Sequence, residues 1–181
     1  MVSKRDWLDI GLRVLAREGA PALTVERLSG RLGVTKGSFY HHFKGMAGFK
    51  VDLLAHFEAE CTTGYIEQAE RGGGTARERF ERLLELVLAD EEDRPLLESA
   101  MRAWAMQDAD VRATQERVDQ ERIGYLARLC AEVGPADEAL PAARLLYFVL
   151  IGSGHVLPPV GPAELREIYA LTTRLGNWGK G

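Results

Sequence analysis

The sequence predicts an all-α protein. Apolar residues recur every three or four positions along most of its 181 residues, which is the spacing of one face of a helix. No long stretch alternates apolar and polar residues, and no Asn-Gly or Asp-Gly turn joins two β-branched runs, so strand signals are missing. Glycines and prolines stand where helices are expected to end. We expect about nine helices, three in an N-terminal domain and about six in a C-terminal domain.

The first two helices are predicted from their ends. The first runs roughly over Lys4–Glu18, with Ser3 as a possible N-cap and Gly19 placed to end it. Thr24 is placed to cap a second, shorter helix, which Gly33 stops. Both helices carry an apolar inner face with the spacing of buried helices.

A third helix over 36–43 completes the pattern of a helix-turn-helix. Phe39 and Phe43 form an apolar pair that faces inward, and Gly33-Val34-Thr35 makes the turn. Lysines on the outer face can donate to guanine or phosphate, hydroxyls and imidazole can reach phosphates or base edges, and a glycine lets the helix come close to the duplex. The candidate DNA-binding residues are Thr24, Thr35, Lys36, Gly37, Ser38, Tyr40, His41 and Lys44.

Charge is distributed unevenly along the chain. The whole sequence has 23 basic and 27 acidic residues, a net charge of −4. Residues 1–50 hold nine basic residues against four acidic ones, a net +5, whereas the remainder holds 14 against 23, a net −9. A basic segment on an acidic chain favours a polyanionic partner for that segment alone, although chance clustering would give the same count.

Residues 22–44 resemble the DNA-binding segment of the TetR family of bacterial transcriptional regulators. The likeness is carried by Ala-Leu-Thr-Val-Glu-Arg-Leu at 22–28 and by Leu-Gly-Val-Thr-Lys-Gly-Ser-Phe-Tyr-His-His-Phe-Lys at 32–44, and it covers roughly residues 6–50. The resemblance implies an all-α homodimer, an operator with dyad symmetry and a ligand pocket in the C-terminal part. It also implies that the eight candidate residues lie where family members contact DNA.

The sequence departs from the family pattern after Lys44. Family members often carry a second lysine at the start of the fourth helix, which contacts a phosphate, and Met46 stands at that place here. We expect this contact to be lost or to be taken over by Lys50. Each lost contact lowers the slope of log affinity against log salt by about one, so DNA binding should depend on salt less steeply than the family norm.

Residues 46–181 predict a helical ligand-binding and dimerisation domain, which follows a DNA-binding domain over 1–45. One long helix is expected over Met46–Arg71 and another over Asp108–Val133. Thr75 with Glu78 forms the capping box of a helix between them.

The last two predicted helices are the candidate dimer interface. The segment 139–154 is apolar on nearly all sides and therefore needs neighbours on both. With a final helix over 162–175 it would form a four-helix bundle across the two-fold axis of a homodimer. The alternative is that 139–154 is the central core helix of a monomer.

Aromatic and soft apolar side chains are the candidate lining of a small-molecule site. They are Cys61, Tyr65, Met101, Trp104, Tyr125 and Phe148. Each of them could equally be an ordinary core residue. Trp104 is favoured among them because a buried indole N–H needs a partner. The sequence does not specify the effector, and no cofactor is expected.

Other classes of protein are disfavoured. No Gly-rich phosphate loop, GxSxG elbow or HExxH motif is present, so an enzyme is not expected. Cys61 and Cys130 lie far apart and no histidine stands at metal-ligand spacing from them, so no metal site is expected and an inert role is favoured over a redox one. Without a signal run or a membrane-spanning apolar stretch, the sequence predicts a cytoplasmic protein with no membrane contact.

The sequence therefore predicts a sequence-specific DNA-binding transcriptional regulator, in its simplest form a repressor that a small-molecule ligand releases from its operator. Ligand binding would act by shifting the helix over 46–71, which leads into the DNA-binding domain. A transcriptional activator is one alternative. Another is a helical protein–protein interaction module with a vestigial DNA-binding head, which would not need a DNA-compatible outer face on 36–44.

Overall fold

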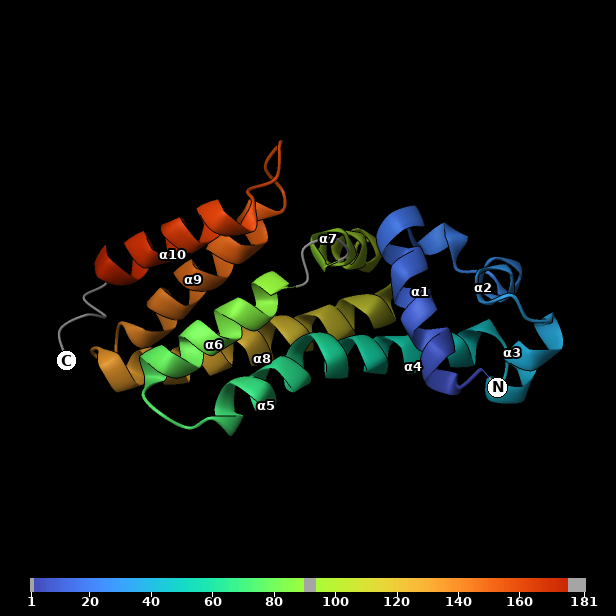
Figure 1. Cartoon of the computed structure of the whole chain (residues 1–181), viewed down its shortest axis with the longest axis horizontal. Helices are drawn as coiled ribbons and strands as arrows, with labels where there is room; N and C mark the ends of the chain where they lie inside the picture. Colours follow the sequence, from blue (N-terminus) through green and yellow to red (C-terminus); the bar gives the residue numbers. More distant parts are fainter. Residues whose placement is uncertain (1, 90–93, 176–181) are drawn as a thin grey trace. The chain divides into compact units, whose positions relative to one another are not determined.

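The computed structural model describes residues 2–89 and 94–175, and within these ranges the chain is helical, without a strand (Figure 1). The α-helices are α1 Lys4–Glu18, α2 Val25–Leu32, α3 Lys36–His42, α4 Met46–Glu58, α5 Gly64–Arg71, α6 Ala76–Ala89, α7 Arg94–Ala105, α8 Ala109–Val133, α9 Ala139–Ser153 and α10 Pro162–Leu175. A 3-10 turn over Ala20–Ala22 follows α1, and a π-helical segment over Ala59–Thr63 joins α4 to α5. Because α4, the π segment and α5 follow without a break, the described residues form nine helical runs, and the predicted fold class is confirmed.

Packing divides the chain into two compact units. The first unit comprises residues up to 61 and from 94 to 115, and so holds α1 to α4, α7 and the start of α8. The second unit comprises residues 62–89 and 116 onward, with α5, α6, most of α8, α9 and α10. The domain boundary after residue 45 concerns function and stays a prediction.

The helix ends confirm the signals in the sequence. The Ser3 hydroxyl accepts a hydrogen bond from the Asp6 N–H at 3.2 Å, and the Asp6 carboxylate accepts one from the Ser3 N–H at 2.7 Å. Thr75 and Glu78 form the same reciprocal pair at 3.2 and 2.8 Å. Gly33 ends α2 in the left-handed region, at φ 67°, which an L side chain rarely adopts. Local sequence therefore determines where these helices begin and end.

An aromatic core fills the first unit, and we use this name for Trp7, Phe39, Phe43 and Phe49. All four side chains are buried, and neighbouring ring centroids lie 5.0–5.6 Å apart. Edge-to-face and tilted contacts at this spacing add stabilisation beyond that of burial alone. α1 packs against α2, α4 and α7, so the aromatic core joins helices that are distant in sequence.

A second core fills the second unit. Tyr125 and Leu129 of α8 are buried in it together with Phe80 of α6. The hydroxyl of Tyr169 in α10 donates to the Leu146 carbonyl of α9 at 2.9 Å, and its ring lies 5.7 Å from that of Phe80. The long helix predicted over Asp108–Val133 is thus confirmed. Among the described residues, no helix combines the length and the apolar character that crossing a membrane requires.

The helix predicted over 46–71 is present as a continuous helical run, which changes to π geometry over Ala59–Thr63. Phe49, Leu53 and Phe57 are buried four residues apart, but the next buried residue, Thr62, comes five residues later. A π turn contains one residue more than an α-helical turn. The extra residue lets α4 and α5 each direct an apolar face into a core, with Ala69 of α5 fully buried.

Gly11 and Gly30 provide a test of the first unit's packing. A Cβ at Gly11 would lie 2.7 Å from Cζ of Phe49 and 3.0 Å from Cδ1 of Leu53, whereas a Cβ at Gly30 would meet nothing within 4 Å. Because alanine favours helix over glycine by about 0.5–1 kcal/mol, Gly30→Ala should raise the free energy of unfolding. Gly11→Ala should lower the free energy of unfolding by about 1–2 kcal/mol, because overpacking against the buried Phe49 and Leu53 side chains outweighs the gain in helix propensity. Thermal unfolding measures both variants, and a stabilised Gly11→Ala protein would contradict the packing described.

Candidate nucleic-acid interface

α2 and α3 are two short helices that pack on each other across the turn at 33–35 (Figure 1). Gly33 reverses the chain, and the Val34 N–H donates to the Ser29 carbonyl at 3.1 Å, which closes the turn. The arrangement is that of a helix-turn-helix, as the sequence predicts.

The inner side of α3 is fixed to the first unit. Phe39 is completely buried in the aromatic core. His42 is half-buried, and its Nε2 lies 3.1 Å from the Val2 carbonyl oxygen. These contacts leave the opposite side of the helix for a partner.

The eight predicted DNA-binding residues run from Thr24, the N-cap of α2, through the turn and α3 to Lys44 just beyond it, and all are exposed except the half-buried Ser38. The Thr24 hydroxyl accepts from the Arg27 N–H at 3.2 Å and so caps α2. Thr35 occupies the N-cap position of α3, but its side chain makes no capping hydrogen bond. Tyr40 is 60% exposed, and its ring stands edge-on to Phe39 at 5.5 Å.

Gly37 has room for a side chain. A Cβ at this position would meet the Thr35 Oγ1 at 3.7 Å, an ordinary van der Waals distance, and φ is not in the left-handed region. The fold itself therefore does not require glycine here, and what glycine provides is a flat surface on the outer face of α3.

Lys36 forms an ion pair with Glu26, which is not among the site residues predicted from the sequence. Its Nζ donates to Oε1 of Glu26 in α2, and the two side chains remain 58% and 66% exposed. The hydrogen bond from the ammonium group lowers the pKa of Glu26. Helical spacing places Glu26 on the outer side of α2, but the ten residues between the partners hide their contact.

A group of arginines carries part of the basic excess. The Glu18 carboxylate accepts from Arg27 and from Arg31, each at 2.7 Å, and both bonds lower the pKa of Glu18. Arg13 and Arg17 line the same cavity of about 400 Å³ as Arg31. Four arginines thus surround one carboxylate on α1 and α2, which makes this surface net positive.

Lys50 is poorly placed to take over the phosphate contact that Met46 cannot make. Its Nζ donates to both Asp108 oxygens at 2.9 and 2.8 Å and pairs with Asp110 at 2.7 Å. These bonds raise the pKa of Lys50 and lower that of Asp108. Because two carboxylates already neutralise this ammonium, Lys50 is poorly suited to bind a phosphate, and the loss of the contact stays a prediction.

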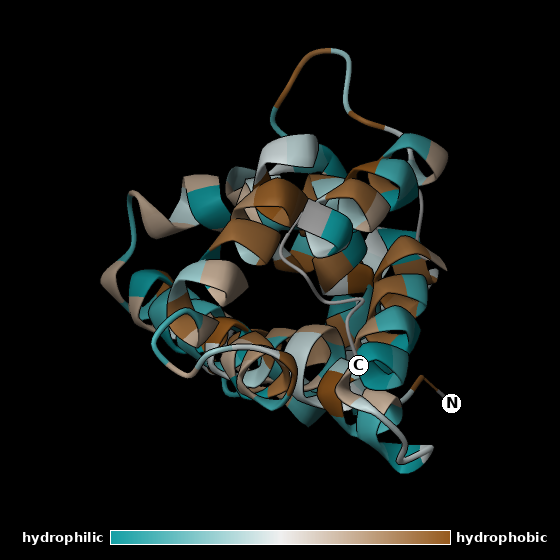
Figure 2. Cartoon of the chain, turned by 90° about the vertical axis from the view of Figure 1, so that its left-hand side faces the viewer, coloured by the Kyte–Doolittle hydropathy of each residue, from teal (hydrophilic) through white to brown (hydrophobic). Residues whose placement is uncertain are grey.

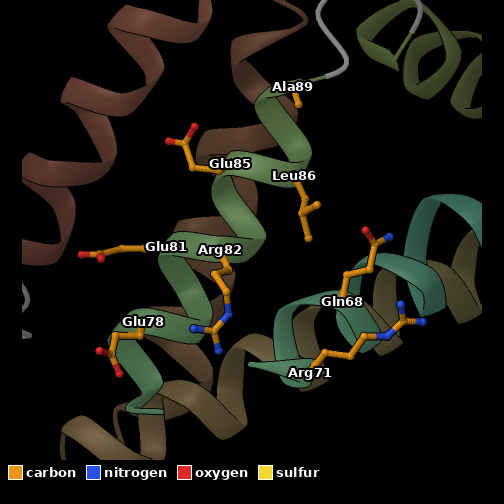
Figure 3. Close-up of a pocket in the computed structure, with 8 residues that line it drawn as sticks. All are labelled: Gln68, Arg71, Glu78, Glu81, Arg82, Glu85, Leu86 and Ala89. Atoms are coloured by element: carbon orange, nitrogen blue, oxygen red, sulfur yellow. The ribbon is translucent and has the colours of Figure 1, made fainter. Parts of the chain in front are cut away.

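Two hollows are candidates for a small-molecule site. One, of about 390 Å³, lies in the first unit and is lined by Trp104, Phe49, Met46 and other apolar side chains, with Lys50 and Asp110. The other is an open cleft of about 870 Å³ in the second unit, where α6 faces α5 (Figure 3). Its lining is Gln68, Arg71, Glu78, Glu81, Arg82, Glu85, Leu86 and Ala89, and so is mainly charged.

The six predicted ligand residues are divided between the units. Cys61, Met101 and Trp104 belong to the first unit and Tyr65, Tyr125 and Phe148 to the second. Trp104 lines the apolar hollow, whereas Met101 and Tyr125 are buried in the cores, where the Tyr125 hydroxyl donates to Glu70 at 2.7 Å. Phe148 is 62% exposed. Burial and the bond to Glu70 raise the pKa of Tyr125. Within residues 2–89 and 94–175, no three His, Cys, Asp or Glu side chains are grouped as metal ligands would be.

Comparison with known proteins agrees with this geometry. The model of bacterial regulatory proteins of the tetR family matches residues 8–49. The sequence matches no curated protein. Three similar solved structures are a transcriptional regulator from Rhodococcus sp. Rha1, the reduced form of NemR from Escherichia coli, and a protein from Saccharomonospora viridis crystallised with choline.

The structural likeness extends over nearly the whole chain. The Rhodococcus protein is 19% identical, with a TM-score of 0.77 over 96% of this chain and 95% of its own. The corresponding values are 20%, 0.79, 94% and 96% for NemR, and 19%, 0.76, 94% and 95% for the Saccharomonospora protein. Residues 8–49 thus match the tetR family of bacterial regulatory proteins, and over nearly its whole length the chain shares the fold of these solved transcriptional regulators.

Proposed function

We propose that the protein is a homodimeric, sequence-specific repressor of transcription that a small molecule releases from its operator. The observation that carries this proposal is the outer face of α3. Its polar residues are exposed, while Phe39 anchors the inner side of the helix in the aromatic core. A rigid helix with donors on one face suits the major groove of DNA.

Each residue of the face has a proposed part. Lys36 would donate to guanine, and Ser38 to a base edge or a phosphate. Thr24, Thr35, Tyr40, His41 and Lys44 would contact phosphates and set the register of the helix on the duplex. Two such heads in a dimer would place their α3 helices in successive major grooves, roughly 34–36 Å apart.

Exposed apolar side chains on α9 and α10 support the homodimer. Leu145 and Phe148 of α9 and Leu171 of α10 are all exposed. The loop between the two helices adds Leu157, and Figure 2 shows this loop at the top with hydrophobic residues along it. Apolar side chains gathered on one pair of helices suit burial against a second copy of the same pair.

The hollow beside Trp104 is the proposed effector site. It adjoins Met46, the first residue of α4. α4 is the next helix along the chain after α3, the helix proposed to enter the major groove. The choline bound to the Saccharomonospora protein supports a small organic cation as one class of ligand, since the indole ring of Trp104 attracts cations. A ligand bound there would displace the start of α4 and so weaken DNA binding. The coupling free energy between the ligand site and the DNA site would be about 1–3 kcal/mol.

Titration of the protein into labelled DNA from upstream of its own gene tests the proposal. We expect saturable binding that survives excess random DNA and weakens between two stated salt concentrations. The same assay then screens ligands for release of the DNA. Binding that random DNA removes equally would contradict sequence specificity, and absence of binding at low salt would favour the interaction-module alternative.

Gly37→Ala tests close approach of α3 to the duplex. The protein should fold with unchanged or higher stability, because the added methyl group has room and alanine favours helix. Operator affinity should nevertheless fall about tenfold or more, which corresponds to about 1.4 kcal/mol. Gly124→Ala in α8, where a Cβ also has room, is the control and should bind DNA like the unaltered protein. Equal affinity for both variants would show that α3 does not come close to DNA at residue 37.

Met46→Lys tests the lost phosphate contact. A lysine at the first residue of α4 should steepen the slope of log affinity against log salt by about one per subunit. The control is Met106→Lys, which adds the same charge at an exposed position after α7. Binding measured at four or more salt concentrations gives the slopes. Identical slopes for the two variants would mean that the start of α4 lies away from the phosphates.

A further inference from the structure

We propose that Glu26 and Lys36 together read one G·C base pair in each half of the operator, with Lys36 donating to guanine and Glu26 accepting from cytosine. This inference rests on the proposed function, because it requires α3 to lie in the major groove. It assigns a role in sequence specificity to Glu26, which lies on α2 and not on α3, the helix proposed to enter the major groove.

The two side chains form a single polar unit at the joint between the helices. Glu26 is the second residue of α2 and Lys36 is the first of α3, and the ammonium group donates directly to the carboxylate. Both remain more than half exposed. Thr24 and Thr35, the predicted phosphate contacts, are the N-caps of the same two helices, so the pair belongs to the surface proposed to face DNA.

The major-groove edge of a G·C pair is complementary to this unit. Guanine presents the acceptors O6 and N7, and beside them cytosine presents the N4 amino donor. A lysine alone can select guanine, and an adjacent carboxylate can accept from N4 and would be repelled by the O4 acceptor of thymine. The order of donor and acceptor also distinguishes G·C from C·G.

The contribution of the Glu26–Lys36 ion pair to protein stability does not explain why Glu26 stands at this position. An exposed ion pair of this kind contributes little to the stability of a fold. A carboxylate also repels phosphates, so on a DNA-facing surface it lowers affinity for every sequence. Two other roles compete with base reading: Glu26 could favour the start of α2 through the helix dipole, or could hold Lys36 away from DNA.

Selection from a library of random duplexes, followed by sequencing, separates these roles. The full-length protein is compared with Glu26→Gln, Glu26→Asp and Lys36→Ala, and Glu116→Gln in α8 is the charge-matched control at an exposed site. Thermal unfolding of each variant checks the fold. Glu26→Asp keeps the charge and shortens the side chain, so it separates the reach of the carboxylate from its electrostatic effect.

We expect the unaltered protein to select one G·C pair per half-site that the variants no longer select. Both Glu26→Gln and Glu26→Asp should lower the preference for cytosine over thymine about tenfold at that position. Lys36→Ala should relax the preference for guanine in the same base pair. Affinity for random DNA should rise for Glu26→Gln and stay unchanged for Glu26→Asp.

Other outcomes would overturn the inference. Unchanged base preference in both Glu26 variants would leave Glu26 an electrostatic or helix-start residue only. Relaxation of different base pairs by the Glu26 and Lys36 variants would show that the two do not read one pair together. If the unaltered protein selects no sequence at all, the proposed function itself fails, which distinguishes that failure from the failure of this inference.

Discussion

Burial of Phe39 is the constraint on which the DNA-facing surface depends. α3 has seven residues and no side-chain cap, and a helix of that length is not stable alone in water. Its conformation is therefore maintained by the rings of Trp7, Phe43 and Phe49 around Phe39. Because these rings come from α1, from the end of α3 and from α4, the direction in which the outer residues of α3 point is a property of the whole first unit.

Carboxylates moderate the positive charge of that unit. Glu18 is shared by two arginines, Glu26 binds Lys36, and Asp108 with Asp110 binds Lys50. The net +5 of residues 1–50 already counts Glu18 and Glu26, and the pairing of Lys50 with Asp108 and Asp110 lowers the charge available to a polyanion further. Exposed ion pairs exchange readily with other partners, so the pairs at Glu18 and Glu26 can open toward phosphates or bases, whereas the half-buried pair at Lys50 is better shielded from solvent.

Features encoded by neighbouring residues were predictable from the sequence, and those that depend on distant contacts were not. The Ser3 and Thr75 capping boxes and the turn at Gly33 each involve a few consecutive positions. Lys50 meets Asp108 across 58 residues, a contact that no local pattern carries. A tryptophan buried in a core and a tryptophan that lines a cavity have the same helical spacing. The sequence therefore could not show which candidate residues line a ligand site. Trp104 lines a hollow and Tyr125 is engaged by Glu70, and only tertiary structure separates the two cases.

Between α4 and α5, the structure depends on how many residues the π segment contains more than on which side chains they carry. Each residue of an α-helix advances the side chains by about 100° around its axis. Loss of one residue from Ala59–Thr63 would turn the residues that follow it by that angle around the helix axis. The exposed glycines at 72–74 impose no such angular relation. A change of length at 59–63 would therefore alter a helical register, whereas one at 72–74 would disturb the hydrogen bond that Arg82 donates to the Gly73 carbonyl.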